Sequence, residues 1–193
     1  MAATRARSAQ GASKLPRQAG LIAGPGTRGA FLHGEPLLAG TVVLAGETVN
    51  TAAGGVLVLA SSSASGGIIQ LAGGATATVG ADGAVTLHQG NALVAGPLAV
   101  VTPQGQRFRP TSSQAVLVVN VAPGGSRVGA ISGQISTYAG GQPPMVLNAG
   151  EAVAVTGGGG TGPPLVQPVG LATLSRPDPV AAMPRSISAS PSG

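Results

Sequence analysis

Acidic and histidine side chains are few in this sequence, and their spacing does not predict a catalytic centre. General acid–base chemistry needs two carboxylates, or a carboxylate and a histidine, that converge on one substrate bond. Neither His33 nor His88 belongs to a His-x-His or His-Glu-x-x-His segment that would hold zinc. Glu47 and Glu151 each follow a glycine just before a strand, so we expect solvated turn residues, which would form a cation-binding pair only if the first and last strands lay together. The acidic residues are Glu35, Glu47, Asp82, Glu151 and Asp178.

Groups for covalent or phosphate chemistry are missing from the sequence as well. There is no cysteine, which excludes a thiolate nucleophile, a zinc–thiolate site and a disulfide framework. No serine lies in a Gly-x-Ser-x-Gly elbow, and the four glycines at 157–160 are not followed by the Lys-Ser/Thr pair of a phosphate loop. We therefore predict a protein that is not an enzyme and has no catalytic, cofactor-binding or metal-binding residues.

The segment "QRFRP" at 106–110 carries the residues that we single out for a contact with a partner. Side chains alternate between the two faces of a strand, so Arg107 and Arg109 would share one face while Phe108 points to the other. One interpretation is a small basic contact for an acidic partner. The other places Phe108 in the core and leaves both arginines in water.

The positive charge is concentrated in one tail. Residues 1–33 contain five basic residues and no acid, whereas residues 34–156 contain three arginines and four acids. Nucleic-acid-binding domains usually carry basic clusters on the folded part and interleave aromatic residues for stacking. Only 2% of the residues are aromatic, so we expect no nucleic acid as a partner.

The middle of the chain consists of short aliphatic runs that are separated by turn residues. Val, Ile and Thr are enriched in these runs, and Gly, Pro, Asp and Asn lie between them, which is typical of strands in an all-β protein. We predict a compact sandwich or a short β-solenoid-like stack of strands, with irregular N- and C-terminal arms. The predicted strands are 41–45, 56–60, 68–72, 76–79, 84–88, 92–95, 98–102, 115–121, 134–138, 145–148 and 152–156.

Three zones follow from this pattern. Residues 1–33 form a basic tail, residues 34–156 form the all-β domain, and residues 157–193, rich in Gly and Pro, form an arm or linker. Within the domain, Asp82-Gly83 predicts a hairpin with a type I′ turn. The run "VLVL" at 56–59 is apolar on both faces, so we expect both faces to be covered.

From about Gly34 to Thr156 the chain resembles the FecR-like domain, named after a periplasmic regulator of iron-citrate uptake. The matching pieces are the entry strands "LLAGTVVLAGETVNTAAGGVLVLASSS", the succession "IIQLAGGATATVGADGAVTLHQGNALV", the Val-x-Thr-Pro stretch in "GPLAVVTPQGQRF", and the closing strand "VLNAGEAVAV". The resemblance implies an all-β, non-catalytic module outside the cytoplasm that binds another protein or forms part of an envelope structure.

Two functions stay open at this point. The first is an extracytoplasmic protein-binding or scaffold module, periplasmic or extracellular, although the sequence shows no evident export signal. The second is a structural subunit that assembles with itself, through strand edges and terminal arms, into a filament or a larger envelope or extracellular assembly. Its strands carry few of the charges that guard sheet edges. A third interpretation takes the basic start as a targeting segment that is cleaved near residues 20–30. No run reaches the ~20 apolar residues that span a bilayer.

Overall fold

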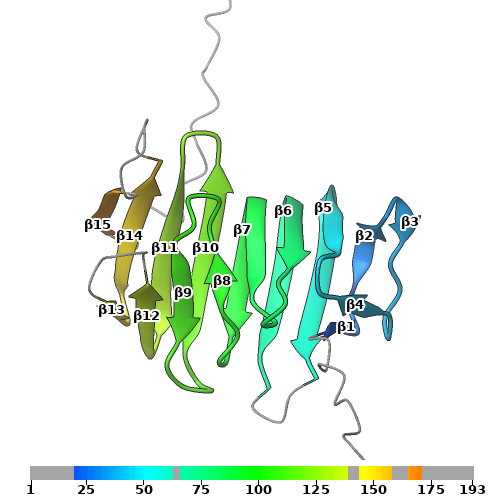
Figure 1. The fold of residues 1–193 in the computed structure, drawn as a ribbon, viewed down its shortest axis with the longest axis horizontal. Helices are drawn as coiled ribbons and strands as arrows, with labels where there is room; N and C mark the ends of the chain where they lie inside the picture. The colour runs from blue at the N-terminus through cyan, green and yellow to red at the C-terminus, as the bar shows by residue number, and fades with distance from the viewer. Residues whose placement is uncertain (1–19, 63–65, 139–143, 158–164, 171–193) are drawn as a thin grey trace, which may run out of the picture.

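The computed structural model describes residues 20–62, 66–138, 144–157 and 165–170, and these residues form fifteen strands and no helix (Figure 1). This confirms the predicted all-β class. One hydrogen-bonded network joins all the strands, and every pairing is antiparallel except that of β7 with β8. The strands are β1 (Gly20–Ala23), β2 (Arg28–Leu32), β3 (Glu35–Pro36), β4 (Val42–Leu44), β5 (Thr48–Ser61), β6 (Ile68–Val79), β7 (Val85–Ala95), β8 (Val100–Val101), β9 (Arg107–Pro110), β10 (Val116–Ala122), β11 (Gly125–Ser132), β12 (Gln134–Tyr138), β13 (Met145–Asn148), β14 (Glu151–Thr156) and β15 (Leu165–Gly170).

The network folds into two layers because three long strands, β5, β6 and β7, pass through both of them. The first half of β5 pairs with β2, and its second half pairs with β1. Beyond β7, the chain adds β8, β9, β12 and β13 to one layer and β10, β11, β14 and β15 to the other, so that β9 and β12 lie in front of β10 and β11 in Figure 1. We call the layer of β10 and β11 layer 1, and the layer of β9 and β12 layer 2. Layer 1 also contains β1, β4, the second half of β5, the first half of β6 and the second half of β7. Layer 2 also contains β2, β3, the first half of β5, the second half of β6 and the first half of β7.

The core lies between the layers and is built from one face of each strand. In β5, Val49 and Thr51 are buried in layer 2, and Leu57 and Leu59 are buried in layer 1. The alternation follows from the pleat, which turns successive side chains to opposite faces. Phe108 of β9 is the largest fully buried side chain, and almost all the rest of the core is Val, Leu, Ile and Ala.

The passage from one layer to the other requires glycine where neighbouring strands touch. Gly90 of β7 has φ +91°, and a Cβ atom on it would lie 2.5 Å from Cα of Ala75 in β6. In β5, which pairs with β6, a Cβ on Gly55 would lie 2.4 Å from the carbonyl oxygen of Gly29 in β2. The ladder is interrupted here, and the buried Oγ1 of Thr51 accepts the N–H of Ala75 at 2.8 Å, which replaces a lost backbone hydrogen bond.

The strands extend beyond the predicted zone of residues 34–156 at both of its ends. β1 and β2 both come from the expected basic tail, so strand structure in the described residues begins at Gly20 and not near Gly34. β15 comes from the expected irregular arm and pairs along its whole length with β14. The predictions on residues 1–19 and 171–193 lie outside the described residues.

The edges of the sandwich are formed by short strands. Among the described strands, β3 and β4 at one end and β13 and β15 at the other have a paired neighbour on one side only. β15 carries Pro168, which cannot donate a backbone hydrogen bond and is confined to edge positions in sheets. Part of the Pro-rich arm therefore extends layer 1 as its last strand.

We predict that Gly90→Ala destabilises the domain much more than Gly74→Ala. Both glycines have positive φ, but Gly74 has open space around the added methyl group. Gly74→Ala should cost about 1 kcal/mol for the backbone conformation alone. Gly90→Ala should cost at least about 2 kcal/mol more, because the methyl group overlaps the backbone of β6. Urea unfolding followed by circular dichroism measures both, and equal losses would contradict the close contact of β6 and β7 at this bend.

Candidate functional site

The two predicted contact residues lie on β9, on the outer side of layer 2. Phe108 between them is fully buried, Arg107 is half-buried and Arg109 is exposed. The predicted alternation is therefore confirmed, and it holds Phe108 in the core as the second interpretation required. The arginines also share a pocket, so the structural role of Phe108 does not exclude a contact role for its neighbours.

Arg107 forms an ion pair with Asp82 in the loop between β6 and β7. Nη1 of Arg107 lies 2.5 Å from Oδ2 of Asp82, while Oδ1 of Asp82 accepts the backbone N–H of Ala84 at 3.1 Å. The hydrogen bond from Arg107 is the main reason why the pKa of Asp82 lies below its usual 3.8. The hairpin predicted at Asp82-Gly83 is present, but the type I′ turn is wrong: Gly83 has φ +77°, whereas Asp82 does not adopt positive φ. The carboxylate of Asp82 instead stabilises a longer loop.

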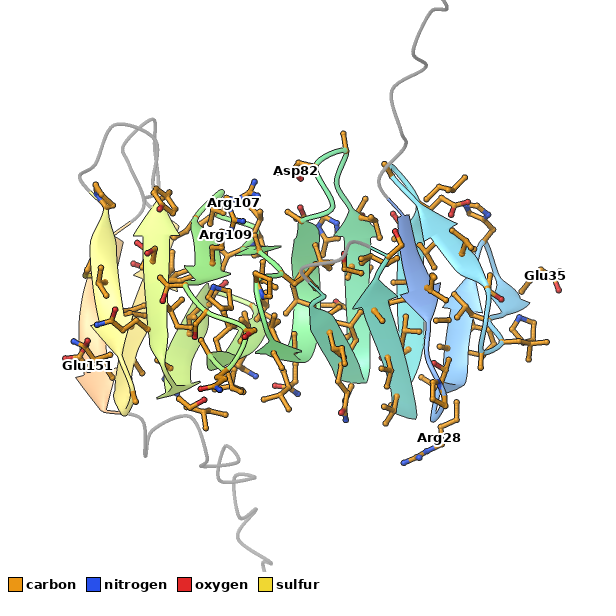
Figure 2. The ribbon with its side chains drawn as sticks, turned by 90° about the horizontal axis from the view of Figure 1, so that it is seen from below. Arg28, Glu35, Asp82, Arg107, Arg109 and Glu151 are labelled. Atoms are coloured by element: carbon orange, nitrogen blue, oxygen red, sulfur yellow. The ribbon has the colours of Figure 1, made fainter. Side chains whose placement is uncertain are left out.

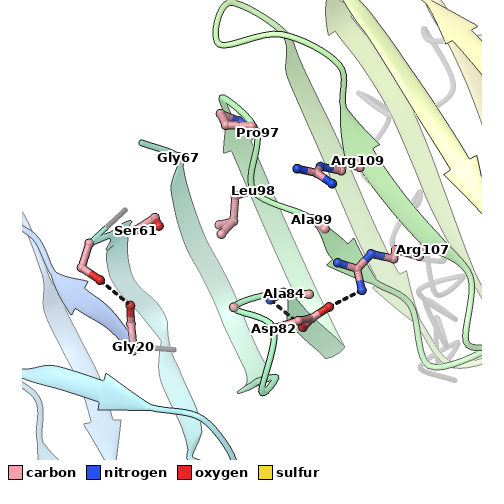
Figure 3. A pocket seen from close by; sticks show the side chains of 12 residues that line it. Gly20, Ser61, Gly67, Asp82, Ala84, Pro97, Leu98, Ala99, Arg107 and Arg109 are labelled. Atoms are coloured by element: carbon pink, nitrogen blue, oxygen red, sulfur yellow. Dashed lines mark hydrogen bonds and ion pairs between the residues drawn. The ribbon is translucent and has the colours of Figure 1, made fainter. Parts of the chain in front are cut away.

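A surface pocket of about 390 Å³ lies beside this ion pair (Figure 3). Both arginine side chains line it, and the guanidinium of Arg109 has no hydrogen-bond or ion-pair partner among the residues that the structure describes. The segment that crosses from layer 1 to layer 2 between β7 and β8 provides an apolar wall. The lining residues are Asp82, Gly83, Ala84, Arg107 and Arg109 on one side, Pro97, Leu98 and Ala99 on the crossing segment, and Gly20, Ser61, Ser62 and Gly67 at the far end.

Glu47 and Glu151 are held in two separate turns. Oε2 of Glu47 accepts the N–H of Leu44 at 2.6 Å, and Oε2 of Glu151 accepts the N–H of Asn148 at 2.7 Å. Both carboxylates thus close a turn in which the preceding glycine has positive φ. Their place in a turn just before a strand agrees with the prediction, whereas their hydrogen bonds to the backbone were not expected. β5 and β14, which follow these turns, lie at opposite ends of the molecule (Figure 1), so Glu47 and Glu151 do not form a cation-binding pair.

The histidines are also separate from each other and from the pocket. His33 is exposed, with Nε2 3.9 Å from Oε1 of Glu47, and Nε2 of His88 lies 2.9 Å from the hydroxyl of Thr78. Among the described residues there is no group of three or more His, Asp or Glu side chains that could hold a metal ion. The charged groups that the fold does bring together are Asp82, Arg107 and Arg109, which sit on the same side of the molecule in Figure 2.

The outer face of layer 1 carries a row of apolar side chains that crosses six strands. Each member is paired in register with the next, and Val42 and Ile68 are about half exposed, at 51% and 49%. We call this set the apolar row; in spatial order it is Val42, Ile22, Ala60, Ile68, Ala95 and Val116.

The second row of side chains on this face is also mostly apolar, and polar side chains become frequent only in the third row. The second row contains Val58, Gln70, Leu93 and Val118. In the third row, Asn120 donates a hydrogen bond to Asn91 at 2.7 Å, and Arg127, which is paired with Asn120, adds a positive charge. The prediction that "VLVL" is covered on both faces is thus wrong for the described part of the chain: Leu57 and Leu59 are buried, but Val56 and Val58 remain partly exposed.

The outer face of layer 2 is polar over the same three long strands. The hydroxyl groups of Thr48 and Thr78 are hydrogen-bonded at 2.8 Å, and Nε2 of Gln89 donates to Oγ1 of Thr76 at 3.3 Å. The two halves of one strand therefore present different chemistry: β6 exposes Ile68 on layer 1 and Thr78 on layer 2. This difference marks the outer face of layer 1 as the unusual surface.

Comparison with models of protein families and with curated protein sequences finds no match for this chain. The FecR-like resemblance thus stays a prediction from the motifs. In the described residues, no helix has the length and apolar character needed to cross a membrane.

We predict that Arg107→Gln raises the pKa of Asp82 toward its usual value. The guanidinium favours the ionised carboxylate, so its loss removes the main cause of the lowered pKa. Because the folded-state pKa is below the unfolded one, the pair stabilises the domain above about pH 4 and loses this effect as the pH falls through the folded pKa. A carbon-detected NMR titration of the Asp82 carboxyl group measures the change. An unchanged midpoint in Arg107→Gln, with Arg109→Gln as control, would contradict the ion pair.

Proposed function

We propose that this protein is a non-catalytic protein-binding or scaffold module and that it binds its partner through the outer face of layer 1. The observation that carries the proposal is the apolar row, which is continuous across six strands and lies next to a second, mostly apolar row. The free energy falls when a partner covers apolar side chains that would otherwise stay in water. Contiguous exposed apolar patches therefore mark interaction surfaces.

The chemistry of this face indicates what the partner presents. No charge lies in the first two rows among the described residues, so charge complementarity would contribute little there. We therefore propose a partner protein with an apolar, flat contact surface. The FecR-like resemblance of the motifs supports a location outside the cytoplasm, either periplasmic or extracellular.

Site-specific photo-crosslinking tests this proposal in the cells that produce the protein. We expect a photoreactive phenylalanine analogue at Ile68 to give one discrete adduct and the same analogue at Thr78, on the polar face of the same strand, to give none. Adding Leu93→Lys to the Ile68 probe should remove the adduct, because a lysine would have to be buried without a counter-charge. Equal adducts from both faces, or none from Ile68 while circular dichroism shows an intact fold, would contradict the proposal.

The second function that the structure supports is a subunit that assembles with itself, and a different observation favours it. β4 at one end and β13 at the other each leave one side unpaired among the described strands, and both expose apolar side chains, with Val42 at 51% and Val146 at 47%. Open strand edges of this kind pair with strands of another chain.

We predict that, if the edges mediate assembly, Val42→Lys combined with Val146→Lys converts large assemblies into monomers. Lysine on an edge strand opposes the approach of a second edge. Sedimentation velocity over a range of concentrations, with negative-stain microscopy, measures the change, and Thr78→Lys is the matched control on a strand that has neighbours on both sides. A wild-type protein that stays monomeric at every concentration would end this second proposal.

A further inference from the structure

The pocket beside β9 has a different chemistry from the apolar row, although Ser61 and Gly67 at its far end adjoin Ala60 and Ile68 of that row. The pocket beside β9 contains two guanidinium groups and one carboxylate, so its lining residues carry a net charge of one positive unit. Arg109 has five N–H donors and no described partner, whereas Arg107 is engaged through Nη1 by Asp82. The pocket thus has an unused donor group, carried by a strand that the buried Phe108 anchors to the core.

We propose that this pocket binds the side-chain carboxylate of an acidic peptide segment, with Arg109 as the main donor. We further propose that Asp82 occupies part of the site in the free protein and competes with that carboxylate. The proposal does not rest on the apolar row, and each can fail without the other.

The charge of the site favours a carboxylate over a phosphate group. A guanidinium presents parallel N–H donors that match the two oxygens of a carboxylate. A phosphate monoester carries about 1.5 to 2 negative charges at pH 7 and would meet the carboxylate of Asp82 in the same pocket. One negative charge is enough to neutralise the lining residues.

The remaining walls favour a peptide as the carrier of that carboxylate. Pro97, Leu98 and Ala99 form an apolar wall against which the methylene groups of a glutamate can pack. Gly20 and Gly67 at the far end contribute backbone and no side chain to the lining. The pocket of about 390 Å³ is large enough for a few residues and is open to solvent.

The role of Asp82 follows from its position and exposure. Its side chain is 53% exposed, so the ion pair with Arg107 is screened by water and replaceable. An incoming carboxylate would be repelled by Asp82 and attracted by both arginines. Removing the charge of Asp82 should therefore strengthen binding, although the residue itself lines the site.

NMR titration of the full-length protein tests the proposal, with the peptide acetyl-Gly-Leu-Glu-Gly-amide as the probe. We expect the glutamate peptide to shift the Nε–H signal of Arg109 and the amide signals of Leu98 and Ala99. The matched peptide with Gln in place of Glu should bind at least about tenfold more weakly, since a hydrogen bond to a charged group contributes about 1.5 to 3 kcal/mol. Raising the salt concentration from 0.05 to 0.5 M should weaken binding severalfold.

Three variants separate the roles of the charged residues. Arg109→Gln should weaken binding at least about tenfold, and Arg127→Gln on the other layer should leave it unchanged. Asp82→Asn should tighten binding about threefold to tenfold, because one nearby negative charge is removed. Equal binding of the Glu and Gln peptides, tighter binding of inorganic phosphate than of the Glu peptide, or weaker binding by a folded Asp82→Asn protein would overturn the proposal.

Discussion

The structure depends on the contact between strands at the bends of β5, β6 and β7. At these bends Gly90 lies against Ala75, and Gly55 lies against Gly29, with no space for a side chain between the backbones. Because the bends coincide, three consecutive strands leave one layer and enter the other together, and the inner faces of both layers close on one aliphatic core. Every later strand then extends one of the two layers that these bends create.

The same constraint separates two kinds of surface. Each long strand has one outward face on layer 1 and another on layer 2, so a single sequence segment can supply apolar residues to the first and threonines to the second. Ile68 and Thr78, both in β6, illustrate the difference. Water can solvate the hydroxyl groups of layer 2, whereas the removal of the apolar row from water is favourable in free energy. The arginine pocket provides a third surface, where charge and not apolar area would determine binding.

Much of the fold was predictable from the sequence, because strand runs and turn residues are local signals. The strands at Gln134–Tyr138 and Met145–Asn148 agree with the predicted ranges residue by residue, and Gly-Glu lies in a turn before β5 and before β14, as expected. β11 was missed because "GSRVGAIS" contains two glycines and an arginine and lacks a clear aliphatic run. The join of 68–72 and 76–79 into one strand was not predictable either, since Gly73 and Gly74 look like an ordinary turn and their role depends on the neighbouring strands.

In the candidate sites, too, local features were predictable from the sequence and features that depend on neighbouring strands were not. The alternation of Arg107, Phe108 and Arg109 follows from the period of a strand, so the shared face of the two arginines was predictable. Their proximity to Asp82 was not, because 25 residues separate Arg107 from it and no local pattern connects them. The apolar row needs the register of six strands, and the aliphatic residues that form it cannot be told from core residues by composition.

The register of the strands in layer 1 is therefore the central claim, since a slip of one residue would turn the apolar row into the core. Methyl NOE spectroscopy of the protein tests it most directly. We expect NOEs from the methyl groups of Ile68 to those of Ala60 and Ala95, its neighbours on the outer face, and none to Leu57 or Phe108. NOEs from Ile68 to Leu57 or Phe108 would place this residue in the core and contradict the register.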